Sequence, residues 1–405
     1  MQPNRSIHDY EQRLARARRN LKPMRNGEVA LRFLDHLGTL GLSVGRVTKY
    51  AGHLPVLLRE IDLDLKAMSR KDVERVVAWI NSRPQKEWTK HDKKLTLRKI
   101  VQYAKRGSCA KGTSLPKEVS WISLTVNEKD SRVTPESLLT PDEFSAIVNA
   151  TTNKRDRAMV YVLFEAALRP GELLTMFVGS VAFKDGYCLV TANGKTGIKR
   201  IPLIVSYKPL LEWLQEHPLR NNPNAPLWCA LASNYAGDRL SYRYFRAVIK
   251  RLAEKADLKK DVWPYLYRHT TLTAMAKVFT ESRLEQFAGW TFGSKMTRRY
   301  VHFSARDLES AMLELHGLKP AERANGMPTL IECSRCGNKN PFGNIRCSFC
   351  GMILDRETAE RTQELEQKSG EELQRKNEEL QTRLEKLETV ISSLLASQVE
   401  ASNVH

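Results

Sequence analysis

Apolar residues recur at helical spacing along most of this chain, and only one short region alternates as strands do. Positions i, i+3, i+4 and i+7 are apolar in four N-terminal segments, namely 28–41, 44–61, 70–83 and 91–106, which is the pattern of helices with one buried face. The stretches GYCLVTA and IKRIPLI have strand character and flank Asn193-Gly194, a pair typical of tight hairpin turns. The sequence therefore predicts a mainly α protein with a small antiparallel β-sheet.

Breaks in this periodicity divide the chain into six parts. We expect a basic N-terminal helix over residues 1–25, an all-helical domain over 26–110 and a linker over 111–138. An α+β domain over 139–320, a cysteine-paired module over 327–354 and a charged helical tail over 355–399 should follow. The α+β domain opens at Thr140-Pro141-Asp142-Glu143, where Thr140 and Glu143 can form a capping box around a first-turn proline. A chain of 405 residues has room for two or three domains.

Positive charge is concentrated outside the tail. The whole chain carries +19, but residues 355–405 hold 7 Lys and Arg against 12 Asp and Glu, so the tail carries −5 and the remainder +24. A body this basic indicates a polyanionic partner, most often nucleic acid; the alternative is a basic protein without such a partner. Because no apolar run reaches the ~18 residues of a membrane span and the N-terminus lacks a signal-like apolar stretch, we expect a cytoplasmic, nucleoid-associated protein.

Four of the seven cysteines form two Cys-x-x-Cys pairs, at Cys333, Cys336, Cys347 and Cys350. In a chain without a signal peptide such pairs favour metal binding over disulfides. Glycines directly after each pair permit the tight turns in which backbone N–H groups point at sulfur, and four thiolates give Zn²⁺ a closed, structural site. We therefore predict a zinc ribbon; iron is the second choice and a redox role the third. The single cysteines are expected to be small buried apolar residues, at Cys109, Cys188 and Cys229.

Five residues of the α+β domain stand out by their order along the chain, which is Arg169, Lys195, Arg268, Trp290 and Tyr300. Taken singly, each has an ordinary structural explanation. An arginine at a helix end or a lysine at a hairpin tip is usually solvated, and a tyrosine near a tryptophan is usually packed against it. The combination is far more specific than any one of its members.

This order resembles the catalytic domain of the tyrosine recombinases, the phage-integrase family of site-specific recombinases. The stretch ALRPGEL is similar to the first arginine box of that family, with Glu172 at its acidic position. Lys195 corresponds to the hairpin lysine, and YLYRHT corresponds to the His-x-x-Arg box, which places Arg268 as its arginine. AGW, ending at Trp290, matches the Gly-His/Trp site, and Tyr300 matches the nucleophile. Three features resemble archaeal members of the family more than bacterial ones: the stretch GLSVGRVTKY, the missing box histidine and the added cysteines.

The resemblance covers about residues 26–318 and implies an enzyme that cuts and rejoins DNA through a 3′-phosphotyrosine at Tyr300, without metal or nucleotide. Arg169 and Arg268 would clamp the transition-state oxygens, for which the planar guanidinium fork suits better than lysine. Lys195 would protonate the leaving 5′-oxygen with a lowered pKa. Trp290 would pack beside the phosphate. The implied partner is double-stranded DNA, clamped by the N-terminal helical domain, with a tetramer acting on two sites.

The sequence departs from the family at Tyr265, where a histidine is usual. A tyrosine can donate a hydrogen bond to phosphate, but with an ordinary pKa of about 10 it is a poor base at neutral pH. The general base is therefore open. His269 and His302 are nearby candidates, although the favoured interpretation of His269 is a satisfied core histidine. Tyr265 as the nucleophile is a remote alternative, because the start of a helix cannot easily swing into a phosphate site.

Leucines recur every seventh residue in the tail, at Leu373, Leu380, Leu387 and Leu394. With leucine at heptad position d and Asn377 at position a, the pattern is typical of a parallel two-stranded coiled coil whose asparagine fixes the register. We expect a dimer through the tail, and a lone charged helix is the alternative. For the whole chain the other functions considered are a type IB topoisomerase and a catalytically inactive DNA-binding regulator. The DNA target cannot be read from the sequence.

Overall fold

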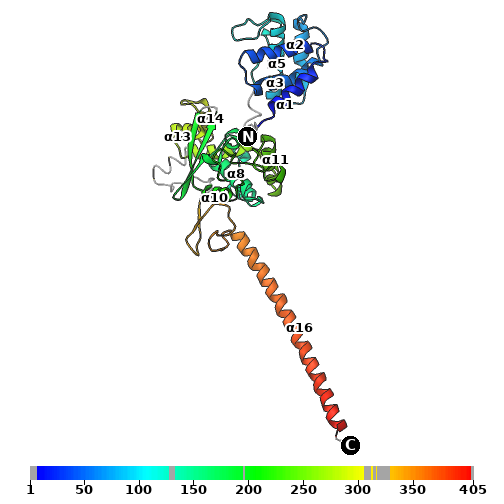
Figure 1. Ribbon diagram of the computed structural model, residues 1–405, viewed down its shortest axis with the longest axis vertical. Coiled ribbons are helices and arrows are strands. Elements are labelled where there is room, and N and C mark those ends of the chain that lie inside the picture. The colour runs from blue at the N-terminus through cyan, green and yellow to red at the C-terminus, as the bar shows by residue number, and fades with distance from the viewer. Residues whose placement is uncertain are drawn as a thin grey trace. The chain divides into compact units, whose positions relative to one another are not determined.

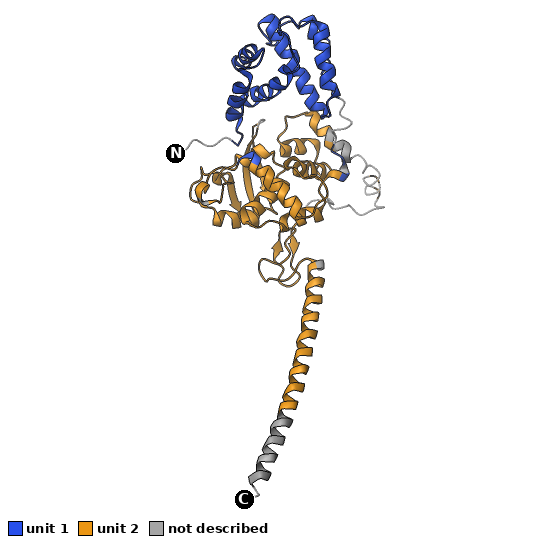
Figure 2. Cartoon of the chain, turned by 90° about the vertical axis from the view of Figure 1, so that its right-hand side faces the viewer, with its two compact units in different colours: residues 1–136, 241–243 blue, residues 137–240, 244–405 orange. Residues whose placement is uncertain are grey.

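The computed structural model describes residues 7–126, 133–194, 197–304, 312, 316 and 329–402. The chain forms two compact units, one made of residues 1–136 and 241–243 and the other of residues 137–240 and 244–405 (Figure 2). Among the described residues, no helix has both the length and the apolar character that crossing a membrane requires.

Helices build the described part of the first unit (Figure 1). They are α1 (Tyr10–Leu21), α2 (Gly27–Thr39), α3 (Val44–Leu58), α4 (Arg70–Ser82), α5 (Glu87–Arg106) and α6 (Lys117–Ser120). Their apolar faces meet in one core, with side chains such as Phe33, Leu54, Leu97 and Ile100 fully buried. The helical periodicity of the sequence thus predicted α1 to α5 correctly.

The packed part of this unit extends beyond residue 111, where the sequence predicted the start of a linker. Cys109, Val119 and Ile122 are buried in the same core as the helices. The polar backbone of this segment is also satisfied, since Gln102 Nε2 donates to Thr113 O at 2.9 Å. Helix α6 has only four residues, too few to show a helical period, so the sequence pattern could not reveal it.

The second unit combines helices with a three-stranded antiparallel sheet of order β1-β2-β3. Its strands are β1 (Val181–Lys184), β2 (Tyr187–Gly194) and β3 (Gly197–Leu203). Its helices before the cysteine module are α7 (Pro141–Asn149), α8 (Lys154–Glu165), α9 (Pro170–Leu174), α10 (Tyr207–Glu216), α11 (Tyr242–Lys255), α12 (Pro264–Met275), α13 (Glu281–Ala288) and α14 (Lys295–Ser304). Gly194 pairs with Gly197 across the hairpin, which confirms the predicted hairpin. The predicted turn residues Asn193 and Gly194 are themselves the last residues of β2, so the connection follows them.

Local sequence signals fix the start of α7 and the burial of α8. Thr140 Oγ1 accepts from the Glu143 amide at 3.2 Å and Glu143 Oε2 accepts from the Thr140 amide at 2.8 Å, which is the predicted capping box. Every side chain from Ala158 to Phe164 is buried, so α8 runs through the centre of the core. Helices α10 and α12 both pack against it.

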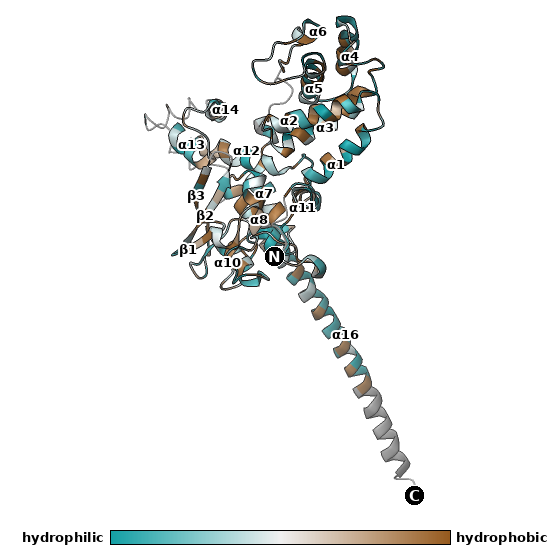
Figure 3. Ribbon diagram, turned by 45° about the horizontal axis from the view of Figure 1, so that its top comes forward, coloured by the Kyte–Doolittle hydropathy of each residue, from teal (hydrophilic) through white to brown (hydrophobic). Residues whose placement is uncertain are grey.

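The cysteine module contains a two-stranded ladder of β4 (Ile331–Glu332) and β5 (Lys339–Asn340). It contacts α8 and α10 of the same unit, because Tyr161 Oη donates to Phe342 O at 2.5 Å and Lys208 Nζ donates to Lys339 O at 2.8 Å. The tail forms one long helix, α16 (Arg356–Ser402). Apolar residues recur along its described part (Figure 3), and its exposed leucines include Leu373, Leu380, Leu384 and Leu387.

Candidate active site

Arg169 stands at the junction between the end of α8 and the start of α9. The chain turns there through Ala167, whose φ of 47° lies in the left-handed region that non-glycine residues rarely adopt. Glu172, one turn into α9, accepts two hydrogen bonds from Arg169, from the backbone amide at 2.9 Å and from Nη1 at 2.6 Å. The carboxylate of Glu172 is buried while the side chain of Arg169 is 26% exposed. Glu172 therefore orients the arginine and leaves part of its guanidinium open.

Arg268, on the second turn of α12, is only 4% exposed. Its Nη1 donates to Ala167 O at 2.5 Å and its Nη2 donates to Ala288 O at 2.8 Å, so one guanidinium joins the ends of α8 and α13. Burial, reinforced by the neighbouring charge of Arg169, lowers the pKa of Arg268 to about 10. The two arginines of the sequence prediction therefore lie in one electrostatic environment.

Lys199, which sequence analysis did not single out, belongs to the same cluster. Its Nζ lies 3.0 Å from Glu172 Oε2, and its side chain is 8% exposed. Burial lowers the pKa of Lys199 to about 8, and the positive charges of Arg268 and Arg169 act in the same direction against the attraction of Glu172. Strand alternation was the available signal, because residues 199, 201 and 203 share the inward face of β3.

Two glycines make room for this buried ion pair. A Cβ on Gly194 would come within 2.5 Å of Glu172 Oε1, and a Cβ on Gly289 would come within 3.1 Å of Lys199 Cδ. Gly289 also ends α13 with a φ of 64°, in the left-handed region. Both close approaches require the absence of a side chain.

Tyr300 is buried on α14, at 2% exposure, in a small apolar cluster with Ala167, Leu272, Leu284 and Ala288. The ring of Trp290 stacks on it with centroids 5.4 Å apart and an interplanar angle of 25°. Trp290 also lies next to Arg268, whose Cζ is 5.7 Å from the indole centroid. The structure thus brings together Tyr300 of α14, Arg268 of α12 and Trp290, which follows the C-cap of α13.

His269 contacts the hydroxyl of Tyr300 directly. Nδ1 of His269 lies 2.8 Å from Tyr300 Oη, and the two rings are inclined by 24°. The loop before α14 is held by Glu285, whose carboxylate accepts from the Ser294 amide and from Thr297 Oγ1, both at 2.9 Å. The favoured sequence interpretation of His269 as a plain core histidine is therefore incomplete, because its partner is the predicted nucleophile.

Three further sequence candidates are either exposed or have side chains outside the described residues. Tyr265 lies on the first turn of α12 with 41% of its surface exposed. Lys195 lies outside the described residues, in the connection between β2 and β3. His302 lies in α14, but its side chain is outside the described part of the chain.

Comparison with known proteins agrees with this geometry. Residues 137–306 match the model of the phage integrase family. The matched segment contains Arg169, Lys195, Arg268, Trp290 and Tyr300, so the resemblance noted from the sequence is supported for this phage integrase segment. The match ends before the cysteine module and the tail.

Individual relatives extend the comparison. The chain is 30% identical over 184 residues to a tyrosine recombinase of Synechococcus elongatus, covering 44% of this chain and 55% of the relative. It is 22% identical over 306 residues to the tyrosine recombinase XerA of Saccharolobus solfataricus, covering 72% and 94%. The crystal structure of XerH bound to palindromic difH substrate, a post-cleavage complex, is similar in fold, with a TM-score of 0.53, 16% identity and coverage of 78% and 98%. The chain spans only 55–60% of the length of the first two curated relatives that it matches.

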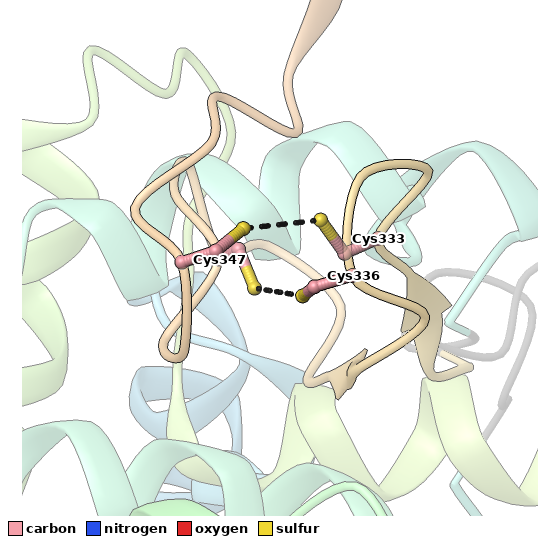
Figure 4. Close-up of side chains that lie close together, drawn as sticks. Cys333, Cys336 and Cys347 are labelled. Atoms are coloured by element: carbon pink, nitrogen blue, oxygen red, sulfur yellow. Dashed lines mark hydrogen bonds between the residues drawn. The ribbon is translucent and has the colours of Figure 1, made fainter.

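The four paired cysteines form a candidate metal centre outside the phage integrase segment. Their sulfur atoms all lie within 4.8 Å of one another, and Cys333–Cys350 and Cys336–Cys347 are each 3.6 Å apart (Figure 4). Zn–S bonds of about 2.3 Å in a tetrahedron place sulfurs about 3.8 Å apart, so the donor set fits that ion. Buried Asn340 supports one ligand, since its Nδ2 donates to Cys347 Sγ at 3.5 Å.

Proposed function

We propose that this chain is a site-specific DNA recombinase that breaks and rejoins DNA strands through a covalent bond between Tyr300 and a 3′-phosphate. The observation that carries the proposal is the convergence of the Tyr300 ring, the Trp290 ring and the Arg268 guanidinium in one small cluster. A tyrosine nucleophile keeps the energy of the broken phosphodiester in the phosphotyrosine bond, so a free 5′-hydroxyl can reseal the strand without a cofactor.

Arg169 and Arg268 bind the non-bridging oxygens of the phosphate in this proposal. Charge gathers on those oxygens in the transition state, and guanidinium groups fixed beforehand stabilise it without reorganisation. Both groups are fixed here, Arg169 by Glu172 and Arg268 by two backbone carbonyls. Trp290 packs beside the phosphate, and Tyr265, half open at the helix start, donates a hydrogen bond to it.

The departing 5′-oxygen takes its proton from a lysine. Lys195 at the hairpin tip is the candidate that the family resemblance indicates, and Lys199 is a second one, because its pKa of about 8 places it near the operating range of a general acid at neutral pH. Both lie on the same hairpin. Separate Lys195→Met and Lys199→Met variants distinguish them by which one loses cleavage of an ordinary substrate but keeps cleavage of a substrate with a 5′-thiolate leaving group.

Double-stranded DNA is the proposed substrate, and the first unit contributes much of the contact. The charge of +24 outside the tail supports binding to phosphate. Strand exchange between two sites requires four nucleophiles, so the working assembly is a tetramer, with the tail helix α16 pairing chains as a parallel coiled coil.

The cysteine module holds one structural Zn²⁺ through Cys333, Cys336, Cys347 and Cys350 in this proposal. Four thiolates leave no open position on the ion, so the metal orders the module and takes no part in strand cleavage. Iron bound by the same four sulfurs is the alternative, and metal analysis of the purified protein separates the two.

Covalent selection from a random duplex library tests the function and finds the target sequence in the same experiment. Nicked duplexes with a randomised core are incubated with the wild-type chain, and DNA that stays attached to protein under denaturing conditions is recovered and sequenced. We expect enrichment of a defined sequence with wild type and none with Tyr300→Phe, a variant that lacks only the hydroxyl.

Two results would redirect the proposal. Relaxation of supercoiled plasmids without any enriched site would favour the topoisomerase alternative. Binding to DNA without any covalent product, in wild type as in Tyr300→Phe, would favour the inactive regulator.

A further inference from the structure

We propose that His269 is the general base of the reaction: it removes the proton from the Tyr300 hydroxyl during cleavage and returns it during religation. This inference rests on the proposed function and assigns the one step that Tyr265, in place of the usual histidine, leaves without a residue. The observation behind it is the direct contact of 2.8 Å between His269 Nδ1 and Tyr300 Oη.

The position of His269 is fixed from both sides of that contact. His269 follows Arg268 on α12, and Arg268 is anchored to the ends of α8 and α13 by its two carbonyl hydrogen bonds. Tyr300 sits on α14, whose entry is tied to α13 through the Glu285 carboxylate. The two rings lie nearly parallel, at 24°, with centroids 5.9 Å apart. The hydrogen bond between Nδ1 and Oη therefore joins two nearly parallel rings.

Histidine suits this task better than the other candidate in the site. The histidine side chain ordinarily has a pKa of about 6.5, so a neutral imidazole accepts a proton readily at neutral pH. A tyrosine hydroxyl does not. Tyr265 is also 41% exposed at the start of α12, and it remains a phosphate-contacting group. With the imidazole proton on Nε2, the Tyr300 hydroxyl donates to Nδ1, which is the direction that proton transfer needs.

The step balances without any further reactant. As the Tyr300 oxygen forms its bond to phosphorus, its proton moves to His269 Nδ1 and gives an imidazolium. The bond between phosphorus and the 5′-oxygen breaks, and that oxygen takes a proton from the lysine of the site. Religation runs in reverse: the 5′-hydroxyl attacks, its proton returns to the lysine, and the imidazolium protonates the departing Tyr300 oxygen.

A His269→Asn variant tests the role of the imidazole. The asparagine amide oxygen occupies about the position of Nδ1 and accepts the hydroxyl hydrogen bond, but it is not basic. We expect the single-turnover rate of covalent complex formation, on a suicide substrate obtained from the library selection, to fall by about 10²–10⁴-fold. A matched control is His217→Asn, which changes a buried histidine elsewhere in the same unit and should keep a rate close to wild type.

Replacing the nucleophile separates proton removal from a purely structural role. Tyr300 is exchanged for a ring-fluorinated tyrosine, whose more acidic phenol needs less help from a base. In this background the loss caused by His269→Asn should shrink to within about tenfold, while the thermal unfolding midpoints of the variants stay unchanged.

The outcomes are distinct. If His269→Asn cleaves at the wild-type rate, or if fluorination leaves its defect unchanged, His269 is not the base, while the recombinase proposal stands. If wild type itself forms no covalent complex, the proposed function fails and this inference fails with it.

Discussion

At the scale of single residues, the site holds more positive than negative charge. Arg169, Arg268 and Lys199 surround a single buried carboxylate, that of Glu172. Burial by itself would raise the pKa of Glu172, but the charge of Lys199 and the bonds from Arg169 hold that pKa below its usual range. Like charges in a poorly solvated site repel one another, and a phosphate would relieve this repulsion. The free protein thus carries an electrostatic strain that a bound phosphate, as in the proposed DNA complex, would relieve.

Proton uptake on DNA binding is the measurable consequence of this arrangement at Lys199. With a pKa of about 8 in the free protein, the side-chain amine of Lys199 is about half protonated at pH 8. A phosphate bound beside it favours the charged form and raises the pKa, so binding takes up about half a proton at that pH. Calorimetry in buffers of different ionisation enthalpy should show this uptake with wild type, and Lys199→Met should abolish it.

The pH dependence of the proton uptake shows whether Lys199 is the group that takes up the proton. Below about pH 7 the free lysine is already protonated, and the uptake should fade as the pH is lowered. Uptake that is equal at pH 6 and pH 8, or that persists in Lys199→Met, would show that another group is responsible.

Some of these residues could be predicted from the sequence and others could not. Arg169, Arg268, Trp290 and Tyr300 were singled out because their neighbouring residues form recognisable boxes. Lys199 carries no motif, and only its place on the inward face of β3 marks it. The partner of His269 depends on how α14 packs against α12, a long-range contact that no local pattern encodes.

At the scale of elements, local signals predicted where regular structure begins. The capping box at Thr140 and the hairpin of β2 and β3 appear in the structure as expected. Asn193 and Gly194, however, belong to β2 and not to the turn. Short elements such as α6 were not predicted, because a single helical turn is too short to show a periodic pattern of apolar residues. The packing of the cysteine module against α8 and α10 could not be predicted either, because it joins residues far apart in the chain.

The contacts of the cysteine module with α8 and α10 allow its metal site to be tested. Cys347→Ser removes one of four ligands, and we expect bound zinc to fall from about one ion per chain to about none. The backbone at Phe342 should then lose order, because the hydrogen bond from Tyr161 is held by the folded module. Metal analysis and hydrogen exchange measure the two effects.

The control for this variant is Cys188→Ser, which changes a buried cysteine of β2 outside the module and should leave the zinc content at the wild-type value. A Cys347→Ser protein that keeps its full zinc content would contradict the four-ligand site.

At the scale of the whole molecule, the positive charge and the proposed dimer interface lie in different parts of the sequence. The positive charge lies in the body, while the tail carries −5, so α16 is poorly suited to lie on DNA. Its described leucines are largely exposed in the single chain, with Leu373 at 65%, Leu380 at 56% and Leu387 at 59%. A stripe of this kind on a helix of 47 residues is stabilised when a second helix covers it.

Association through this stripe should survive without DNA and depend on its leucines. One chain has a mass of 46.3 kDa, so light scattering should give about twice that mass for wild type. Leu380→Asp places a charge in the seam and should yield the monomer mass, because burying an unpaired carboxylate between helices is costly. Thr382→Asp adds the same charge on the outer face of the helix and should leave the dimer intact. If wild type is monomeric, or if both variants dissociate equally, the leucine stripe is not the dimer interface, and assembly must come from contacts made on DNA.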